Sequence, residues 1–221
     1  YHGCVPLKED GTLKSVRIFG RTYKGKSLYE VLESYVRKGF YAVDPKEKER
    51  GRDIMWYIWL SENSPLFGKD KMATFERYFL AEKETHKEKK NPYYLLLEDE
   101  KVVERILKEF GLENEDAHII NGHVPVKCKD GENPIKCGGK VLVIDGGFSR
   151  AYQKETGIAG YTLIYNSYGL ILAAHEPFES TEAAIEKESD IHSDSTVVKR
   201  TLERKKVEDP DVGKELKEQI S

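Results

Sequence analysis

Two histidines stand beside glycine where predicted strands end. His2 precedes Gly3, and His123 follows Gly122. In α/β sheets, ligands and metals gather outside the carboxyl ends of the strands. Neutral imidazole suits Mn, Fe, Zn and Ni ions, so two such groups on neighbouring strands could share one ion. Two ligands do not make a catalytic site, and the remaining ligands must come from elsewhere.

The residues around His123 are suited to aiming its imidazole ring. The apolar run Ile119-Ile120 ends before Gly122, which lets the backbone bend sharply, and Pro125 restricts the residue before it. The alternative is a histidine at a strand end whose ring is satisfied by a backbone carbonyl group. The residues alone leave both interpretations open.

A third candidate segment, residues 141–152, reads VLVIDGGFSRAY. An apolar strand ends in Asp145 and two glycines and then delivers Arg150 into a loop. Paired glycines allow a ligand to approach the backbone, and Arg150 could hold a phosphate through two hydrogen bonds. The alternative is a tight turn that carries a surface arginine.

The composition gives no reason to expect nucleic acid or a membrane as a partner. The chain of 221 residues carries 36 Lys and Arg against 39 Asp and Glu, a formal net charge of −3, so no global field attracts either one. Charged residues make up 34% of the chain and are mostly interleaved by sign, which is typical of a solvated surface. No apolar run approaches the roughly 20 residues of a membrane span, and no secretory signal is visible. A cytoplasmic protein is expected.

The cysteines are predicted to be reduced thiols. Cys4, Cys128 and Cys137 are an odd number in a chain too large to need disulfide bonds. Cys128 and Cys137, with His118 and His123, suggest a zinc site at first sight. The eight residues between the two cysteines do not match the spacing of structural zinc sites, and none is expected.

An α/β framework is expected to position these residues. In the first part of the chain, the sequence predicts a strand over 16–19, a helix over 27–38, a charged loop over 45–52 and a mostly buried helix over 53–60. The helix at 27 begins with the capping-box pattern SLYE.

Helices and strands alternate in the rest of the chain. Helices are predicted over 73–84 and 98–110, and strands over 117–121 and 140–145. A hairpin is predicted from two strands, 160–166 and 170–175. After residue 180 the chain becomes polar and shows only short helical patches.

The beginning of the chain predicts a fragment. The sequence opens without Met, and residues 1–6 read like the end of a strand that turns through glycine. A front part that supplies further metal ligands is therefore expected to be missing.

Three long stretches, in the same order, resemble class III fructose-1,6-bisphosphatase, a family of calcineurin-like metallophosphoesterases. They are MATFERYFLAEKETHKEKKNPYY at 72–94, HIINGHVPVK at 118–127 and GGKVLVIDGGFSRAYQKETGIAGYTLIYNSYG at 138–169. The resemblance runs from HGCVP to ERKKVEDPDVGKEL, essentially end to end. A histidine after a strand, then G-H-x-P, then a strand ending in I-D-x-G is also the order of the carboxyl-terminal half of the superfamily.

The resemblance implies a two-metal, usually manganese-dependent phosphatase that removes the 1-phosphate of fructose 1,6-bisphosphate in gluconeogenesis. By the superfamily pattern, His2 and His123 ligate the second metal. Many relatives carry G-H-x-H, whose second histidine completes the first metal. Pro125 stands at that position here, which puts in doubt a third histidine ligand from this half. The motifs D-x-H, G-D-x-x-D and G-N-H-D have no counterpart in the chain, as expected if the front half is missing.

Arg150 and Arg77 are the candidates for binding the phosphate. Two ions about 3.5–4 Å apart can activate a bridging water, and an arginine would neutralise charge that develops on the phosphoryl oxygens. The stretch from Trp59 to Arg77 is loosely similar to the segment of phosphoprotein phosphatases that runs from W-S-D-P to an arginine. The alternative for Arg77 is a surface ion pair with Glu76 or Asp70.

Tyr161 is a candidate on the sugar side of the substrate, and packing within a strand is its alternative. A charged segment typical of class III has no assigned role, and a solvated face is its alternative: His86, Lys87, Lys89 and Lys90. Three histidines are expected to be structural: His118, His175 and His192.

The fold class implied by the resemblance is α/β, the carboxyl-terminal half of a four-layer α/β/β/α sandwich with additional helices. Residues 1–178 would belong to the catalytic domain, with a helical insertion at about 27–112, and residues 179–221 to a polar extension.

Two other functions stay open from the sequence. One is a metallophosphoesterase that acts on phosphoproteins or dinucleotide polyphosphates, although the segment 74–94 resembles class III and neither of these. The other is a non-catalytic binding fragment. The chain by itself is expected to be inactive and to expose apolar surface, and the protein is a candidate homo-oligomer.

Overall fold

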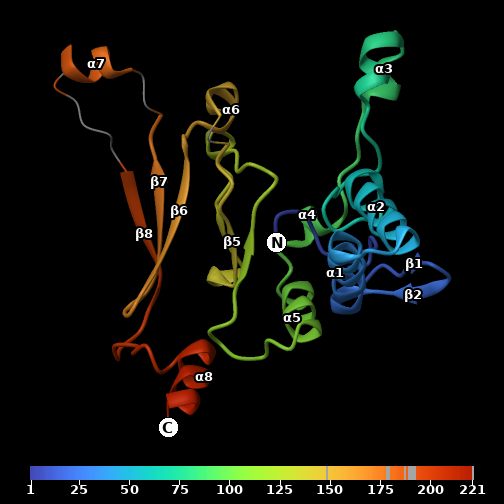
Figure 1. Cartoon of the computed structure of the whole chain (residues 1–221). Coiled ribbons are helices and arrows are strands. Elements are labelled where there is room, and N and C mark those ends of the chain that lie inside the picture. Colours follow the sequence, from blue (N-terminus) through green and yellow to red (C-terminus); the bar gives the residue numbers. More distant parts are fainter. Residues whose placement is uncertain (148, 178–179, 187, 189–192, 221) are drawn as a thin grey trace. The chain divides into compact units, whose positions relative to one another are not determined.

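The structure is a computed structural model that describes all residues except 148, 178–179, 187, 189–192 and 221, and it divides into two compact units (Figure 1). Unit 1 comprises residues 1–123 and 136–142, and unit 2 comprises residues 124–135 and 143–221. Helices and strands occur in both units, so the α/β class is confirmed. The division into a catalytic part over 1–178 and an extension over 179–221 stays a prediction.

The first two strands of unit 1 form a small hairpin that packs on two helices. Strands β1 (Val16–Ile18) and β2 (Arg21–Tyr23) are antiparallel and are followed by helices α1 (Gly25–Tyr41) and α2 (Pro45–Leu60). The core of this part is made of buried apolar side chains from β1, α1 and α2, namely Val16, Ile18, Leu28, Leu32 and Ile54.

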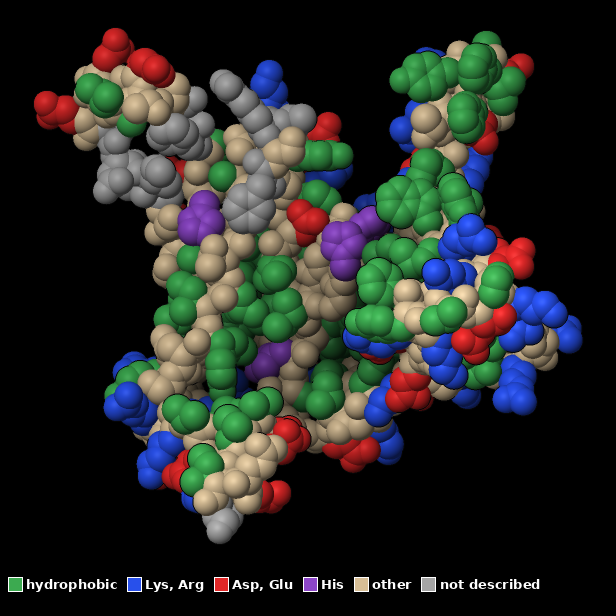
Figure 2. Space-filling model, viewed as in Figure 1, with side chains coloured by type: hydrophobic (Ala, Val, Ile, Leu, Met, Phe, Trp, Pro, Cys, Tyr) green, Lys and Arg blue, Asp and Glu red, His purple; other side chains and the backbone are tan. Residues whose placement is uncertain are grey.

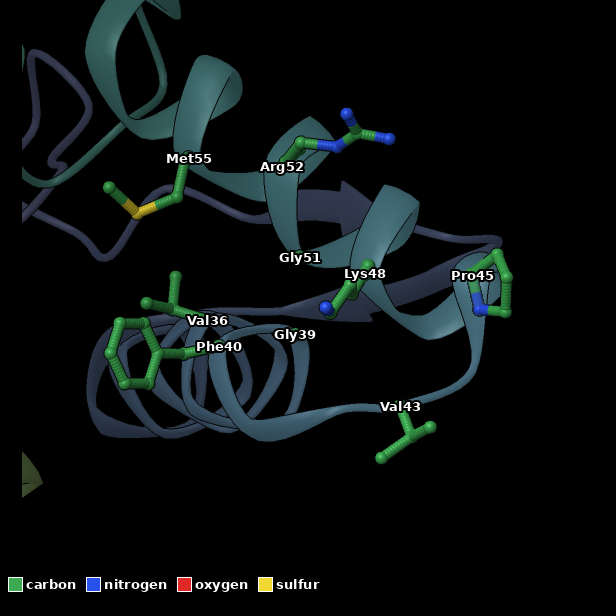
Figure 3. A pocket seen from close by; sticks show the side chains of 9 residues that line it. All are labelled: Val36, Gly39, Phe40, Val43, Pro45, Lys48, Gly51, Arg52 and Met55. Carbon is green, nitrogen blue, oxygen red and sulfur yellow. The ribbon is translucent and has the colours of Figure 1, made fainter.

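A pair of glycines allows α1 and α2 to cross at very short distance. A Cβ atom at Gly51 would lie 2.6 Å from the Cα of Gly39, and one at Gly39 would lie 2.5 Å from the Cα of Gly51. Beside the crossing lies a cavity of about 580 Å³. Figure 3 shows Val36 and Phe40 of α1 on one side of it and Met55 of α2 on the other.

Two expectations for residues 45–60 were wrong. Residues 45–52 form the first half of α2, because the Asp44 side chain accepts a hydrogen bond from the Glu47 backbone N–H and proline at the first helical position suits a helix start. The second half is also less buried than expected: Ile54 is buried, whereas Trp56 and Trp59 are 64% and 61% exposed.

The predicted helix over 73–84 is two separate elements, α3 (Thr74–Phe79) and the 3₁₀ helix η1 (Lys83–His86). Helix α3 ends because Leu80 adopts an extended conformation. Figure 2 shows hydrophobic side chains gathered on the surface of this helix, where Phe75, Tyr78 and Phe79 are exposed.

The remaining elements of unit 1 lead to the strand before His123. Helix α4 (Tyr93–Leu96) precedes α5 (Glu100–Glu109), which confirms the predicted amphipathic helix: four apolar side chains on one face of α5 are buried. Strand β3 (Ile119–Asn121) forms a sheet in the order β3-β5-β4 with β5 (Val141–Val143) and β4 (Ile135–Lys136). The boundary between the units passes through β4 and β5. The 3₁₀ helices η2 (Cys128–Asp130) and η3 (Cys137–Gly139) flank β4 in the sequence.

Unit 2 contains an antiparallel sheet in the order β6-β7-β8. Strands β6 (Gly160–Asn166) and β7 (Gly169–His175) form the predicted hairpin, and β8 (Ser193–Arg200) pairs with β7. Strand β8 was not predicted, because it is an edge strand with exposed polar residues and no clear apolar alternation. Unit 2 also contains η2 and the helices α6 (Arg150–Thr156), α7 (Thr181–Glu186) and α8 (Asp211–Ile220).

Among the described residues, no helix combines the length and the apolar character that crossing a bilayer requires.

Replacing Gly51 with alanine tests the close crossing of α1 and α2. Alanine favours a helix by about 1 kcal/mol over glycine, but its methyl group would collide with the backbone of Gly39. We expect the collision to dominate, so that the free energy of unfolding in urea falls by about 1–3 kcal/mol. Glu49→Ala, at an exposed position of the same helix, is the control and should change stability by less than about 0.5 kcal/mol. A Gly51→Ala variant as stable as the parent would contradict the crossing.

Candidate functional site

The imidazole rings of His2 and His123 lie side by side in unit 1, although 121 residues separate them in the sequence. Nδ1 of His123 is 3.1 Å from Nε2 of His2. The ring centroids are 4.9 Å apart and the ring planes are inclined by 72°. Both side chains are exposed. The structure therefore brings together the two residues that the sequence singled out as metal ligands.

Backbone hydrogen bonds attach the segment before Gly3 to strand β3. The backbone nitrogen of Tyr1 donates to the carbonyl oxygen of Ile120, and the N–H of Gly122 donates to the carbonyl oxygen of Tyr1 at 2.8 Å. These two bonds place His2 next to the end of β3, where His123 follows.

A buried amide, Asn121, joins the two histidine segments. Its Nδ2 donates to the carbonyl oxygen of Gly3 at 3.3 Å and to that of Gly122 at 2.7 Å, while its Oδ1 accepts a hydrogen bond from the hydroxyl of Tyr93. The side chain is only 1% exposed. The sequence analysis missed this residue; the available signal was a polar side chain at the end of an apolar strand, directly before a glycine.

The sharp bend lies at His123 itself and not at Gly122. The φ angle of His123 is +71°, in the left-handed region, whereas Gly122 does not have a positive φ. A Cβ atom at Gly122 would meet only Nδ1 of His2, at an ordinary 3.6 Å. A left-handed residue other than glycine costs about 1–2 kcal/mol, so the surrounding hydrogen bonds hold His123 in a strained conformation.

A cavity of about 320 Å³ lies beside His2. Its walls are mainly apolar, including Leu32, Met55 and Ile58, and no lysine or arginine is among the described residues that line it. The carboxylate of Glu33 in its wall accepts a hydrogen bond from Arg37 at 2.6 Å. Within the described part of the chain, this cavity therefore offers no lysine or arginine side chain to a phosphate group.

No group of three or more His, Cys, Asp or Glu side chains able to hold a metal occurs in the part of the chain that the structure describes. His2 and His123 form a pair of neighbouring imidazoles and no larger cluster in these residues. Their role as metal ligands stays a prediction at this point.

Asp145 and the two glycines after it have a structural explanation in unit 2. A Cβ atom at Gly146 would lie 2.5 Å from the Cα of Gly160, so this glycine permits close packing of two backbone segments. Gly147 has a φ of +66° and donates its N–H to Oδ1 of Asp145 at 3.0 Å. Packing of Gly146 and the turn at Gly147 match the tight turn that was the alternative for this segment, and ligand binding by its backbone stays a prediction. Arg150 is the first residue of α6, and its side chain lies outside the described part of the structure.

Arg77 forms an ion pair with a residue that the sequence did not suggest. Its Nη2 is 3.5 Å from Oε1 of Glu88, whereas the alternative interpretation of Arg77 had named Glu76 or Asp70 as the partner. Glu88 also accepts hydrogen bonds from Lys69 and from the backbone N–H of Ala73. Burial alone would raise the pKa of Glu88, but these hydrogen bonds and the two nearby positive charges lower it below its usual value. The phosphate-binding role of Arg77 stays a prediction.

Tyr161 is buried, and its hydroxyl lies 2.6 Å from Sγ of Cys128 in unit 2. Burial, together with this hydrogen bond, raises the pKa of Tyr161. These contacts match the packing alternative, and a role on the sugar side stays a prediction.

Three other histidines have hydrogen-bond partners of their own. The Nδ1 atom of His118 is 2.8 Å from the carbonyl oxygen of Gly139, and Nε2 of His86 is 3.0 Å from that of Leu80. The two ring nitrogens of His175 contact hydroxyl groups of Thr162 and Ser193. His192 lies outside the described residues.

Comparisons with known proteins identify one family, whose model matches the whole chain. Residues 1–221 match the family described as Firmicute fructose-1,6-bisphosphatase. The chain is 58% identical over 221 residues to fructose-1,6-bisphosphatase class 3 of Clostridium botulinum (strain Hall), and 60% identical over 220 residues to that of Clostridioides difficile (strain 630). These alignments cover 100% and 99% of this chain but 33% of each relative, so the chain spans a third of their length. No solved structure matches.

An Asn121→Asp substitution tests whether the buried amide holds the two histidine segments. It keeps the size and the acceptor for Tyr93 but replaces both N–H donors by an oxygen facing two carbonyl groups. We expect the free energy of unfolding at neutral pH to fall by at least about 1–3 kcal/mol.

Asn133→Asp is the matched control, because Asn133 is exposed and its side-chain oxygen accepts from Ile135 N–H. It should stay within about 0.5 kcal/mol of the parent protein. Equal, small effects of both substitutions would show that Asn121 does not support the site.

Proposed function

Because the chain belongs to the Firmicute fructose-1,6-bisphosphatase family, we propose that the complete protein hydrolyses fructose 1,6-bisphosphate to fructose 6-phosphate and phosphate. The observation that carries this proposal is the convergence of His2 and His123 in a chain that matches the family from end to end. The relatives reported above are named as fructose-1,6-bisphosphatases, so no second function is retained.

The spacing of the two imidazoles suits one shared metal ion. Two nitrogens that each lie about 2.1 Å from one ion, at roughly a right angle, would be about 3 Å apart. The observed separation of 3.1 Å between Nδ1 of His123 and Nε2 of His2 agrees with this value. Without a metal ion, the same distance corresponds to a hydrogen bond between the two rings. We take Mn²⁺ as the ion, because the resemblance to class III fructose-1,6-bisphosphatase implies a manganese-dependent enzyme.

Two bound metal ions would supply an activated water molecule and positive charge next to the phosphate. The chain contributes His2 and His123 as ligands of one ion, and Asn121 fixes the backbone from which both rings project. The other ligands would come from the part of the complete protein that lies outside this chain. Arg150 and Arg77 are the proposed groups that neutralise the phosphoryl oxygens, and Tyr161 is the proposed group near the sugar.

The finer features of the family resemblance belong to the same proposal. We infer a calcineurin-like metallophosphoesterase sandwich of which this chain forms the carboxyl-terminal part, with the helical elements of unit 1 as an addition. The substrate would be a small sugar bisphosphate in the cytoplasm, and the working form would be a homo-oligomer. The relative length of the chain, 33% of its relatives, supports the view that it holds part of this site.

His123→Gly in the complete protein tests the proposed metal site. Glycine adopts the φ of +71° without strain, so the backbone should keep its course and the metal-free protein should be as stable as the parent or up to about 1–2 kcal/mol more stable. Manganese content should fall, and phosphate release from fructose 1,6-bisphosphate should drop by more than about 100-fold, since even indirect partners of metal ligands contribute about 10–100-fold.

His118→Ala is the control, because His118 contacts a backbone carbonyl oxygen. Its loss should lower stability by about 1–3 kcal/mol and leave the manganese content unchanged. If His123→Gly behaves like the control, with full manganese content and a reduced melting temperature, His123 is a structural residue.

Arg150→Ala in the complete protein should reduce kcat by about 10²–10³-fold, because a group that meets charge on the transferred phosphoryl acts in the transition state. The manganese content should not change. Arg77→Ala is the parallel test, and Arg37→Ala, at an exposed arginine paired with Glu33, is the control. Near-native kcat in both the Arg150 and Arg77 variants would refute the assignment of these residues to the phosphate.

A further inference from the structure

A second cavity in unit 1, of about 330 Å³, is lined by five lysines. We call it the lysine cavity; its lysines are Lys8, Lys14, Lys69, Lys89 and Lys90. Three carboxylates, Glu9, Glu62 and Asp70, also line it. Its residues do not overlap those of the cavity beside His2. The buried stretch from Gly3 to Leu7 lies between His2 and Lys8 along the chain.

Backbone hydrogen bonds hold the walls of the lysine cavity together. Residues 6–14 form a tight loop, in which the N–H of Lys8 donates to the carbonyl oxygen of Thr12 and that of Lys14 donates to Pro6, both at 2.9 Å. The segments around residues 69 and 90 form a β-bridge. The N–H of Asp70 donates to the carbonyl oxygen of Lys89 at 2.9 Å. The lysines therefore project from fixed backbone.

Two of the five lysines form ion pairs. Nζ of Lys69 is 2.7 Å from Glu88, and Nζ of Lys89 is 2.6 Å from Glu9. The other three, Lys8, Lys14 and Lys90, form no ion pair with any residue in the described ranges. Two carboxylates of the wall, Glu62 and Asp70, remain besides the one paired with Lys89, so the lining keeps an excess of positive charge.

A buried amide also lines the lysine cavity. Oδ1 of Asn91 accepts hydrogen bonds from the backbone N–H groups of Leu7 and Tyr93, at 3.2 and 3.0 Å. Its Nδ2 has no hydrogen-bond partner within the described part of the chain, although the residue is only 7% exposed. This nitrogen is not fully buried, unlike the rest of the residue, so the cavity wall presents a hydrogen-bond donor to a ligand that accepts from it.

We propose that the lysine cavity, which neither His2 nor His123 lines, binds a small anion that carries a phosphate group. Lysine binds phosphate as a point charge, and Nδ2 of Asn91 adds a hydrogen-bond donor that ammonium groups alone would not provide. Cavities for small molecules start at about 300 Å³, so the size admits a small metabolite and not a macromolecule. This gives a role to Lys89 and Lys90: Lys90 as a direct contact, and Lys89 as part of the wall through its pair with Glu9.

Titration of the complete, metal-free protein with inorganic phosphate, followed by calorimetry at low salt, tests the proposal. Removing the metal with a chelator prevents phosphate from binding at the proposed catalytic ions. We expect saturable binding of one phosphate per chain. The triple variant Lys8→Gln, Lys14→Gln and Lys90→Gln should bind at least about tenfold more weakly, and Glu62→Gln should bind more tightly, because each change alters the charge around the anion.

A second triple variant controls for net charge. Lys38→Gln, Lys46→Gln and Lys101→Gln remove the same charge from exposed lysines outside the cavity, and phosphate affinity should change by less than about twofold. Thermal melts establish that each variant is folded, and Lys14→Gln alone replaces the first triple variant if that one does not fold.

Absence of saturable phosphate binding to the parent protein would overturn the proposal. An equal loss in both triple variants would also overturn it, since phosphate would then follow net charge and not the cavity. The result is independent of the proposed phosphatase activity. A protein that does not hydrolyse fructose 1,6-bisphosphate could still bind phosphate in the lysine cavity. A protein that does hydrolyse it could lack this binding.

Discussion

The candidate site depends on one buried side chain, the amide of Asn121. Its two N–H groups donate to the carbonyl oxygens of Gly3 and Gly122, which are the neighbours of His2 and His123 in the sequence. An amide can do this and a carboxylate or an apolar group cannot, because only the amide offers two donors along with an acceptor. Without it, the carbonyl groups of Gly3 and Gly122 would lose these hydrogen bonds, and the two histidine segments would lose one of the contacts that join them.

This arrangement also accounts for the conformation of His123. Its φ of +71° is unfavourable for a residue with a side chain, and such strain persists only where the surrounding structure determines the backbone from several sides. Strain of this kind is found at functional sites, because it places a side chain where a relaxed backbone would not. In His123 it brings Nδ1 to 3.1 Å from Nε2 of His2.

The sequence predicted those elements whose apolar pattern is strong, and missed those that depend on a specific contact. Helix α5 and the β6–β7 hairpin follow from periodicity and turn residues. The start of α2 was missed because Pro45, its first residue, was interpreted as a loop residue and the N-cap role of Asp44 was not recognised. Strand β8 has too few apolar residues to show alternation.

For the site, residue type and neighbouring glycines were enough to choose His2 and His123, but not to find Asn121. Its role depends on a carbonyl group 118 residues away, which no local pattern reveals. The partner of Arg77 was missed for the same reason. The chain between residues 77 and 88 folds back and brings Glu88 next to Arg77, which no local pattern reveals.

The central claim is that His2 and His123 together hold one metal ion in the complete protein. The most direct test is a crystal structure of that protein grown with manganese, with anomalous scattering recorded at the manganese absorption edge. The account predicts an anomalous peak about 2.1–2.3 Å from both Nε2 of His2 and Nδ1 of His123. A fully occupied manganese peak elsewhere, with the two rings hydrogen-bonded to each other and no metal between them, would contradict it.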